Sequence, residues 1–183
     1  MTSRLAATKA IAMPSKARGF TLMESIFAMV IAAITFTLGV PGLTQTLETN
    51  RLSSQTNTLV GALRLARSEA VKRGASVSVC RVDEHSNACA TDAGGWESGW
   101  LVVTSEGTTL FEAPPLEGPR TLTGSSGLAT SVAFNALGEP SAAGQFMLCE
   151  QRDRGGARAI DLSVIGRIRV TQHAANADAC SAG

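Results

Sequence analysis

A single apolar stretch near the N-terminus constrains the fold more than any other feature of this 183-residue chain. Residues 20–40 carry only one charged side chain, Glu24. At about 1.5 Å of rise per residue, a helix of this length crosses the ~30 Å hydrocarbon core of a bilayer. Lys16 and Arg18 precede the stretch, and such basic residues stay on the cytoplasmic side. We therefore expect a transmembrane helix over residues 20–41, with the rest of the chain across the membrane.

The junction in front of this helix differs from an ordinary secretory signal. A cleavage site of small residues normally follows the apolar run, but Val40-Pro41-Gly42 lacks that pattern. The run Lys16-Ala17-Arg18-Gly19-Phe20-Thr21-Leu22-Met23-Glu24 instead resembles the leader junction of type IV pilins and type II secretion pseudopilins. In that family a prepilin peptidase cuts after the glycine and methylates the new N-terminal residue. The resemblance implies that residues 1–19 are a removed leader, that Gly19 ends it, and that Phe20 is methylated.

The lone acid of the apolar stretch also has a role in this family. A carboxylate inside a membrane helix costs about 2.5–3.5 kcal/mol on insertion scales, so Glu24 points to a function. The resemblance implies that Glu24 pairs with the N-terminal amine of a neighbouring subunit during filament assembly. In the alternative, Glu24 only reaches back to the cytoplasmic interface. The family also implies a bend or loosening of the helix near Pro41-Gly42. A start at Met13 would shorten the leader.

Charge is spread unevenly along the chain. Residues 51–81 hold six basic side chains against one acid, which predicts a solvated helix face rather than a binding site. Residues 82–150 hold nine acids against Arg120, a net charge of −8. The whole chain carries 16 Lys and Arg against 15 Asp and Glu, which excludes a uniformly basic coat for nucleic acid. An aromatic content of 4% argues against a platform on which single-stranded bases stack.

Periodicity predicts one stem helix followed by strands. Residues 42–73 suit an amphipathic helix, and Gly74 suits its end. Beyond Gly74, short segments alternate apolar and polar residues and no helical period recurs. We therefore expect an α+β fold whose head, residues 74–183, consists of antiparallel sheets. The expected strands lie around 75–79, 100–103, 108–112, 132–134, 146–148, 160–164 and 168–170, with an irregular loop over 114–127.

Four cysteines lie in the part of the chain expected in the oxidising periplasm, so disulfides are the default. Of the three connectivities, we favour Cys80–Cys89, which closes a loop after the first strand, and Cys149–Cys180, which ties the tail to a core strand. Metal ligation that uses His85 is disfavoured, because the chain has no CxxC spacing and only two histidines. No catalytic constellation is recognisable, so we predict no enzyme, no metal and no cofactor.

The C-terminal arginines are the strongest candidates for ligand binding. Strand alternation predicts Arg167 and Arg169 on one face, about 6.6–7 Å apart, with Ile168 and Val170 toward the core. Two guanidinium groups at this spacing suit neighbouring phosphates of a nucleic-acid strand. Gly166 would let a phosphate approach the backbone closely. The alternative, which spacing alone favours, is a pair of exposed edge-strand arginines that prevent aggregation.

Several short motifs of the head belong together with the N-terminal helix. They are Val79-Cys80-Arg81, Gly99-Trp100-Leu101-Val102-Val103, Phe134-Asn135 with Gly138, Leu148-Cys149 and Gly166-Arg167-Ile168-Arg169. Through them the chain resembles the FimT/GspH group of minor pilins over nearly all of residues 18–170. The resemblance implies one stem helix packed on a β-sandwich-like head. FimT proteins bind DNA through a C-terminal Gly-Arg-x-Arg motif, and the match assigns that role to Gly166, Arg167 and Arg169. Arg152, Arg154 and Arg158 are supporting candidates on charge alone.

The resemblance favours a minor type IV pilin of FimT type that binds extracellular double-stranded DNA for uptake in natural transformation. Such a protein resides in the inner membrane, with its head in the periplasm, and then joins the pilus at the cell surface. Its partners would be other pilins, the prepilin peptidase and double-stranded DNA, bound weakly and without sequence preference. The alternative is a structural minor pilin, or a GspH-like pseudopilin of type II secretion, without DNA binding.

Overall fold

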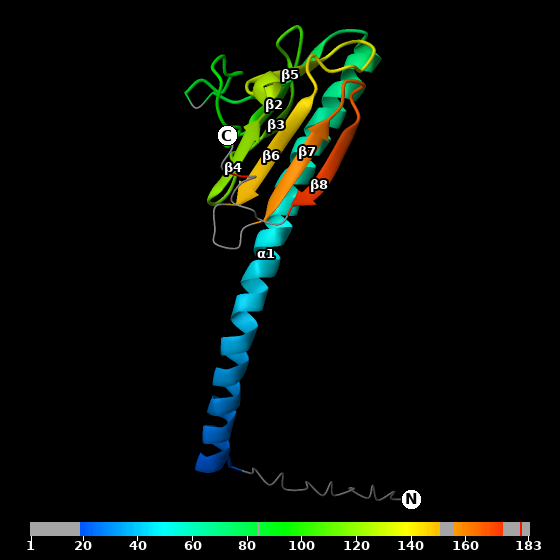
Figure 1. The fold of residues 1–183 in the computed structure, drawn as a ribbon. Coiled ribbons are helices and arrows are strands. Elements are labelled where there is room, and N and C mark those ends of the chain that lie inside the picture. Colours follow the sequence, from blue (N-terminus) through cyan, green and yellow to red (C-terminus); the bar gives the residue numbers. More distant parts are fainter. Residues whose placement is uncertain (1–18, 84, 151–155, 174–179, 181–183) are drawn as a thin grey trace, which may run out of the picture. The chain divides into compact units, whose positions relative to one another are not determined.

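The computed structural model describes residues 19–83, 85–150, 156–173 and 180, without the side chains of 38–45 and 173. It divides into two compact units, residues 1–44 and 45–183. A helix, α1 (Leu22–Arg73), precedes every strand, as Figure 1 shows. The strands are β1 (Val77–Arg81), β2 (Trp100–Thr104), β3 (Thr109–Ala113), β4 (Arg120–Gly124), β5 (Ser131–Phe134), β6 (Gly144–Glu150), β7 (Ala157–Leu162) and β8 (Ile168–His173), with a 3-10 turn, η1 (Ser126–Leu128), before β5.

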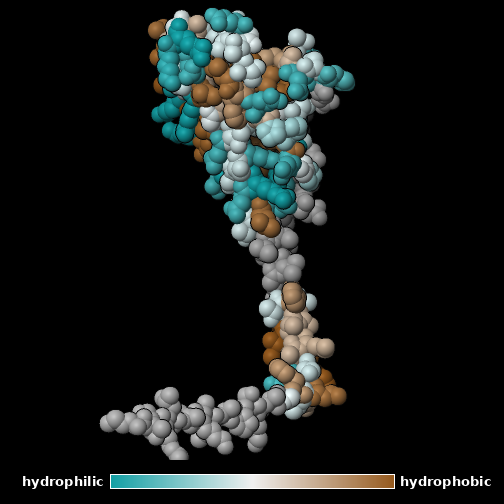
Figure 2. Space-filling view, turned by 180° about the vertical axis from the view of Figure 1, so that it is seen from behind, coloured by the Kyte–Doolittle hydropathy of each residue, from teal (hydrophilic) through white to brown (hydrophobic). Residues whose placement is uncertain are grey.

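In the first unit, Thr21 starts α1. Its Oγ1 accepts a hydrogen bond of 3.2 Å from the backbone N–H of Glu24, the Thr-x-x-Glu signature of a helix start. Apolar side chains between Phe20 and Phe36 are exposed, and Figure 2 shows hydrophobic colours over this stretch. The helix continues through residues 41 and 42, where the resemblance predicts a bend. Within the described part of the chain, no helical stretch is long and apolar enough to cross a membrane.

In the second unit, α1 buries one face. The spacing expected for an amphipathic helix is confirmed, because the residues at that spacing are at most 3% exposed. Gly74 has φ of +61° and ends the helix, and the N–H of Ala75 bonds to the carbonyl of Ala70. The residues of this buried face are Leu52, Leu59, Leu63, Ala66 and Ala70.

Two four-stranded sheets form the head. Their strand orders are β3-β2-β1-β5 and β4-β6-β7-β8, and every pairing is antiparallel. The predicted α+β class with antiparallel sheets is thus confirmed. In the first sheet, Val79 pairs with Val102 on one side and with Val132 on the other, so their side chains share one face. In the second sheet, β8 is an edge strand that pairs only with β7 among the described strands.

Strand β4 corrects one expectation, because it lies within the segment 114–127 that we expected to be an irregular loop. Its inward positions are Arg120 and Leu122, which are 5% and 1% exposed. An arginine at a core position hides the apolar alternation that marks a strand. Nη2 of Arg120 lies 2.6 Å from a carboxylate oxygen of Glu48 on α1 and 3.5 Å from one of Glu150 on β6. These ion pairs compensate the buried charge.

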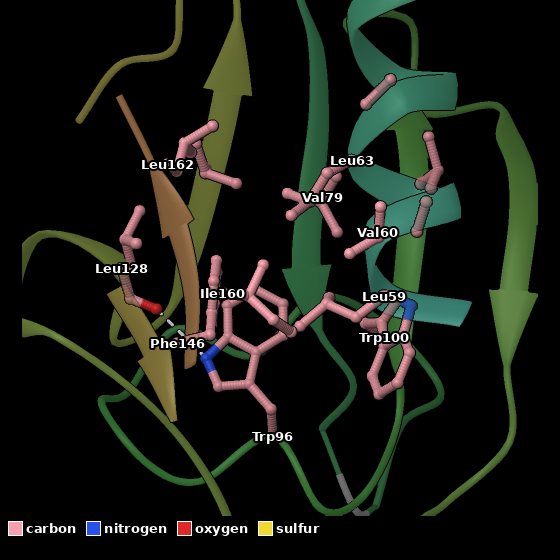
Figure 3. Close-up of a cluster of buried hydrophobic side chains, with 14 of the residues drawn as sticks. Leu59, Val60, Leu63, Val79, Trp96, Trp100, Leu128, Phe146, Ile160 and Leu162 are labelled. Atoms are coloured by element: carbon pink, nitrogen blue, oxygen red, sulfur yellow. Dashed lines mark hydrogen bonds between the residues drawn. The ribbon is translucent and has the colours of Figure 1, made fainter. Parts of the chain in front are cut away.

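One apolar core joins α1 to both sheets. Figure 3 shows Leu59 and Leu63 of the helix facing side chains from the sheets and from the segment before β2. Trp96 lies at its base, where its indole N–H donates to the carbonyl of Leu128 over 3.1 Å. Its ring meets that of Phe146 edge to face, with centroids 5.1 Å apart. This core fixes α1 against the strands that carry the C-terminal arginines.

Both disulfides that the sequence favours are present. Cys80 pairs with Cys89 and Cys149 pairs with Cys180. The first bond joins β1 to a loop that covers the outer face of the first sheet, where Val82 and Leu101 are buried beside Cys80. The second bond attaches residue 180 to the centre of the second sheet, because β6 lies between β4 and β7.

Candidate nucleic-acid interface

Arg67 of α1 holds two turns of the head together. Its Nε donates to the carbonyl of Gly138 over 2.9 Å. Its Nη1 and Nη2 donate to the carbonyls of Gly166 and Ile165 over 3.1 and 3.0 Å. One planar guanidinium group therefore fixes the turn between β5 and β6 and the turn between β7 and β8 to the helix.

The close approach of these turns requires glycine at position 166. Gly166 has φ of +72°, and a Cβ atom there would lie 2.5 Å from the carbonyl oxygen of Gly138. The same Cβ would lie 3.0 Å from Nε of Arg67. The glycine that the resemblance assigns to DNA binding thus has a packing role of its own, which presents the next residue, Arg167, from a fixed turn.

An open hollow of about 660 Å³ lies between α1 and the turn before β8. Four cationic side chains line it: Arg64, Arg67 and Lys72 from α1, and Arg167 from the turn. No carboxylate is among its lining residues, and Val71 and Leu137 supply apolar surface. In Figure 2, hydrophilic and hydrophobic surfaces lie side by side over the upper part of the head. The hollow is a concentrated positive site in a chain of nearly balanced charge.

The structure places Arg167 and Arg169 in different surroundings. Arg167 precedes the first residue of β8, and its backbone N–H bonds to the hydroxyl of Ser163, so strand alternation does not set its direction. Arg169 lies within β8, directly opposite Asp161 of β7. Asp161 also accepts a hydrogen bond of 2.7 Å from Gln145. Arg169 therefore has a carboxylate neighbour across the strand pair, whereas Arg167 lines a hollow without one.

The two residues expected to face the core, Ile168 and Val170, differ in how far they are buried. Ile168 is half-buried and packs against the core. Val170 lies opposite the buried Ile160 but is 40% exposed. The reason is that β8 is an edge strand, and no further described strand covers it.

Of the three supporting arginines, only Arg158 lies among the described residues, and it does not line the hollow. Arg158 lies on β7 opposite the buried Leu148, on the face toward α1. Its Nη2 donates to the hydroxyl of Ser53 over 2.7 Å, so it ties β7 to the helix. Arg152 and Arg154 lie outside the described residues.

The sequence analysis interpreted the basic side chains of 51–81 as a solvated face, and Arg64 and Lys72 are exposed. It did not predict that Arg64, Ser68 and Lys72 line the same hollow as Arg167. Their spacing of four residues, which places them on one helix face, was the available signal. Lys72 also forms an ion pair with Glu69. The carboxylate of Glu69 accepts hydrogen bonds of 3.0 Å from Lys72 and from Arg73. The hydrogen bonds from Lys72 and then Arg73 lower the pKa of Glu69 below its ordinary value.

Metal ligation has no support in the described residues, where no group of three His, Cys, Asp or Glu side chains could hold an ion. The four cations that line the hollow make electrostatic binding of an anion by arginine and lysine the candidate chemistry. Arginine binds phosphate oxygens through two parallel hydrogen bonds, and lysine acts as a point charge.

Comparisons with known proteins agree with the fold. The model of the prokaryotic N-terminal methylation motif matches residues 14–40. The crystal structure of the type IV minor pilin FimU of Pseudomonas aeruginosa is similar in fold, with 24% identity and a TM-score of 0.54 over 68% of this chain and 90% of that one. A second crystal form of FimU matches with 22% identity and a TM-score of 0.49, over 65% and 91%. No curated protein matches the chain.

The family follows from a longer match. The model of the type II transport protein GspH covers residues 55–166, which is more than half of the chain. This range runs from the middle of α1 to the turn before β8 and includes Arg64, Arg67 and Gly166. The chain thus belongs to the GspH family of type IV pilin-like proteins.

Proposed function

We propose that the protein is a minor type IV pilin of FimT type that binds extracellular double-stranded DNA for uptake in natural transformation. The observation that carries the proposal is the position of Arg167, which lines a hollow with three other cations and no carboxylate. Gly166 shapes the turn, Arg167 contacts phosphate, and Arg169 adds charge at the neighbouring edge. Contacts of this kind read charge rather than base sequence.

The N-terminal segment supports assembly into a filament. The methylation motif covers residues 14–40, which includes the expected cleavage after Gly19 and the expected methylation of Phe20. In this proposal the prepilin peptidase removes residues 1–19, residues 20–41 anchor the protein in the inner membrane, and Glu24 pairs with the amine of a neighbouring pilin. The head stays in the periplasm until the pilus carries it to the cell surface. Its role is structural and binding, without catalysis.

The second candidate is a structural minor pilin or a pseudopilin of type II secretion. The observation that favours it is the family model itself, which is described as a type II transport protein. In that case the arginines at residues 167 and 169 would only protect an edge strand. Binding to DNA separates the two candidates, because the second one has no nucleic-acid ligand.

The test is a titration of fluorescently labelled duplex DNA with the full chain in detergent micelles. Fluorescence anisotropy measures binding at about 50 and 200 mM salt. With about three phosphates neutralised, log K should fall against log salt with a slope of about −2.7. Arg167→Gln/Arg169→Gln should abolish most binding. Arg51→Gln, on an exposed part of α1 outside the hollow, serves as the matched control.

Three results are possible. Binding that weakens with salt and depends on the two arginines supports the DNA-uptake pilin. If the folded wild-type protein does not bind DNA, the DNA-uptake function is rejected and the structural minor pilin or secretion pseudopilin remains. Unaltered binding by the double variant rejects the assigned residues.

A further inference from the structure

We infer that helix α1 supplies part of the DNA-binding surface, with Arg64 as a direct phosphate contact beside Arg167. This inference rests on the proposed function and deepens it, because it adds a helix residue to the phosphate contacts assigned to the turn of Gly166 and Arg167. The phosphate chain of double-stranded DNA would lie across the hollow, with one wall formed by α1 and the other by the turn before β8.

The local charge at the hollow is positive. Four cations line it, Arg64, Arg67, Lys72 and Arg167, and no carboxylate is among its lining residues. Glu69, which pairs with Lys72 over 3.0 Å, lies outside this lining. Arg67 donates three hydrogen bonds to carbonyl oxygens, which are neutral acceptors. These bonds use three of its five N–H donors and leave its positive charge uncompensated, so that charge contributes to the field inside the hollow. Such a field favours an anion over any neutral ligand.

Two arginines at the hollow have unengaged hydrogen-bond donors. Arg64 is exposed, and its side chain makes no hydrogen bond or ion pair with another described residue. The same holds for the side chain of Arg167 among the described residues. Two unengaged guanidinium groups thus face one hollow from two elements that Arg67 joins. Each can bind a phosphate through two hydrogen bonds without first breaking an internal one.

The side chains of α1 that line the hollow form a row long enough for several phosphates. Arg64, Ser68 and Lys72 line the hollow at intervals of four residues, which is close to one helical turn. From the first to the last this row extends about 12 Å at 1.5 Å per residue. One strand of DNA carries a phosphate about every 3.4 Å along its axis, so the row is long enough for several of them. An inorganic anion would need only one end of it.

The test compares Arg64→Gln with Arg51→Gln in the full chain, by anisotropy with duplex DNA over a range of salt. Arg64→Gln should weaken binding about two- to five-fold and make the salt slope shallower by about 0.9. Arg64→Lys should keep the slope, because it keeps the charge. Arg51 lies on the same helix outside the hollow, so its variant should bind as the wild type does. Because Arg64 is exposed, thermal unfolding should be unchanged in both glutamine variants.

The outcomes separate this inference from the function on which it rests. If the wild type binds no DNA, both fail. If Arg167→Gln weakens binding while Arg64→Gln leaves affinity and slope unchanged, the proposed function stands and the role of α1 is wrong. Polyglutamate is tested as a competitor of the labelled DNA. If it competes as strongly as unlabelled DNA does, the hollow is a site for acidic protein and the inference is overturned.

Discussion

The Nη1 atom of Arg67 donates a hydrogen bond of 3.1 Å to the carbonyl oxygen of Gly166, and this bond ties α1 to the turn that carries Arg167. The two bonded residues are 99 positions apart in the chain. Gly166 allows the contact because a Cβ atom would collide with the neighbouring turn at Gly138. The turn that carries Arg167 is therefore held by a residue of the helix. Arg67 thus affects both the position of this turn and the charge of the hollow, and variants can separate the two effects.

Arg67→Gln should destabilise the head and weaken DNA binding together. The substitution removes three hydrogen bonds that a charged, partly exposed side chain donates. This loss should lower the free energy of unfolding by about 1–3 kcal/mol. Urea denaturation measures that cost. Arg67→Lys retains the charge but cannot donate to three carbonyls through a planar fork. Full recovery of stability in the lysine variant would contradict the positioning role.

Arg120→Met should be the most destabilising of the arginine variants. The side chain of Arg120 is 1% exposed, and its removal leaves the carboxylates of Glu48 and Glu150 without this partner. Breaking a buried pair in this way costs about 3–5 kcal/mol. The exposed Arg64→Gln should change the free energy of unfolding by less than about 0.5 kcal/mol. Addition of Glu48→Gln and Glu150→Gln to Arg120→Met should recover part of the loss, and a further loss would show that the pairing is not the cause.

The local alternation of apolar and polar residues was enough to predict most of the strands. Alternation located β1 around Val77 and Val79 and β7 around Ile160 and Leu162, since one buried face is sufficient to mark a strand. It failed for β4, where Arg120 occupies a core position and is compensated by acids at residues 48 and 150. Partners this far along the chain leave no trace in a window of a few residues.

The site was harder to predict than the fold for the same reason. The Gly166-Arg167 segment was recognisable from family resemblance, and the structure places Arg167 at the hollow. The expected common face with Arg169 assumed that a regular strand begins at residue 167, but β8 begins one residue later. That Arg64 and Arg167 line one hollow depends on how α1 meets the turn, which is decided by the packing of the whole head and not by spacing within the helix.

The two disulfides should contribute unequally to stability. In the chain-entropy account, a bond across 31 residues stabilises by about 3–4 kcal/mol and one across nine residues by about 2–3 kcal/mol. Cys149→Ala/Cys180→Ala should therefore lower the free energy of unfolding more than Cys80→Ala/Cys89→Ala. Urea denaturation of the two double variants under oxidising conditions compares them directly. The reverse order would mean that the burial of Cys80 beside Val82 and Leu101 outweighs loop closure.

Glu69→Gln should strengthen DNA binding. Glu69 holds Lys72, which lines the hollow, and Arg73 at 3.0 Å each, so its removal frees positive charge. Anisotropy at pH 7 should show a higher affinity and a salt slope steeper by up to about 0.9. Glu106→Gln changes the net charge equally but lies in the turn between β2 and β3, so it should have little effect.

The pH dependence of this effect follows from the lowered pKa of Glu69, whose first cause is the hydrogen bond from Lys72. A carboxyl with a lowered pKa stabilises the folded state above its unfolded-state pKa, and this contribution is lost as the pH falls through its folded-state pKa. Protonation also releases Lys72, so the difference in DNA affinity between wild type and Glu69→Gln should vanish at pH values below the folded-state pKa. A difference that persists there would show that the carboxylate charge is not what restrains Lys72.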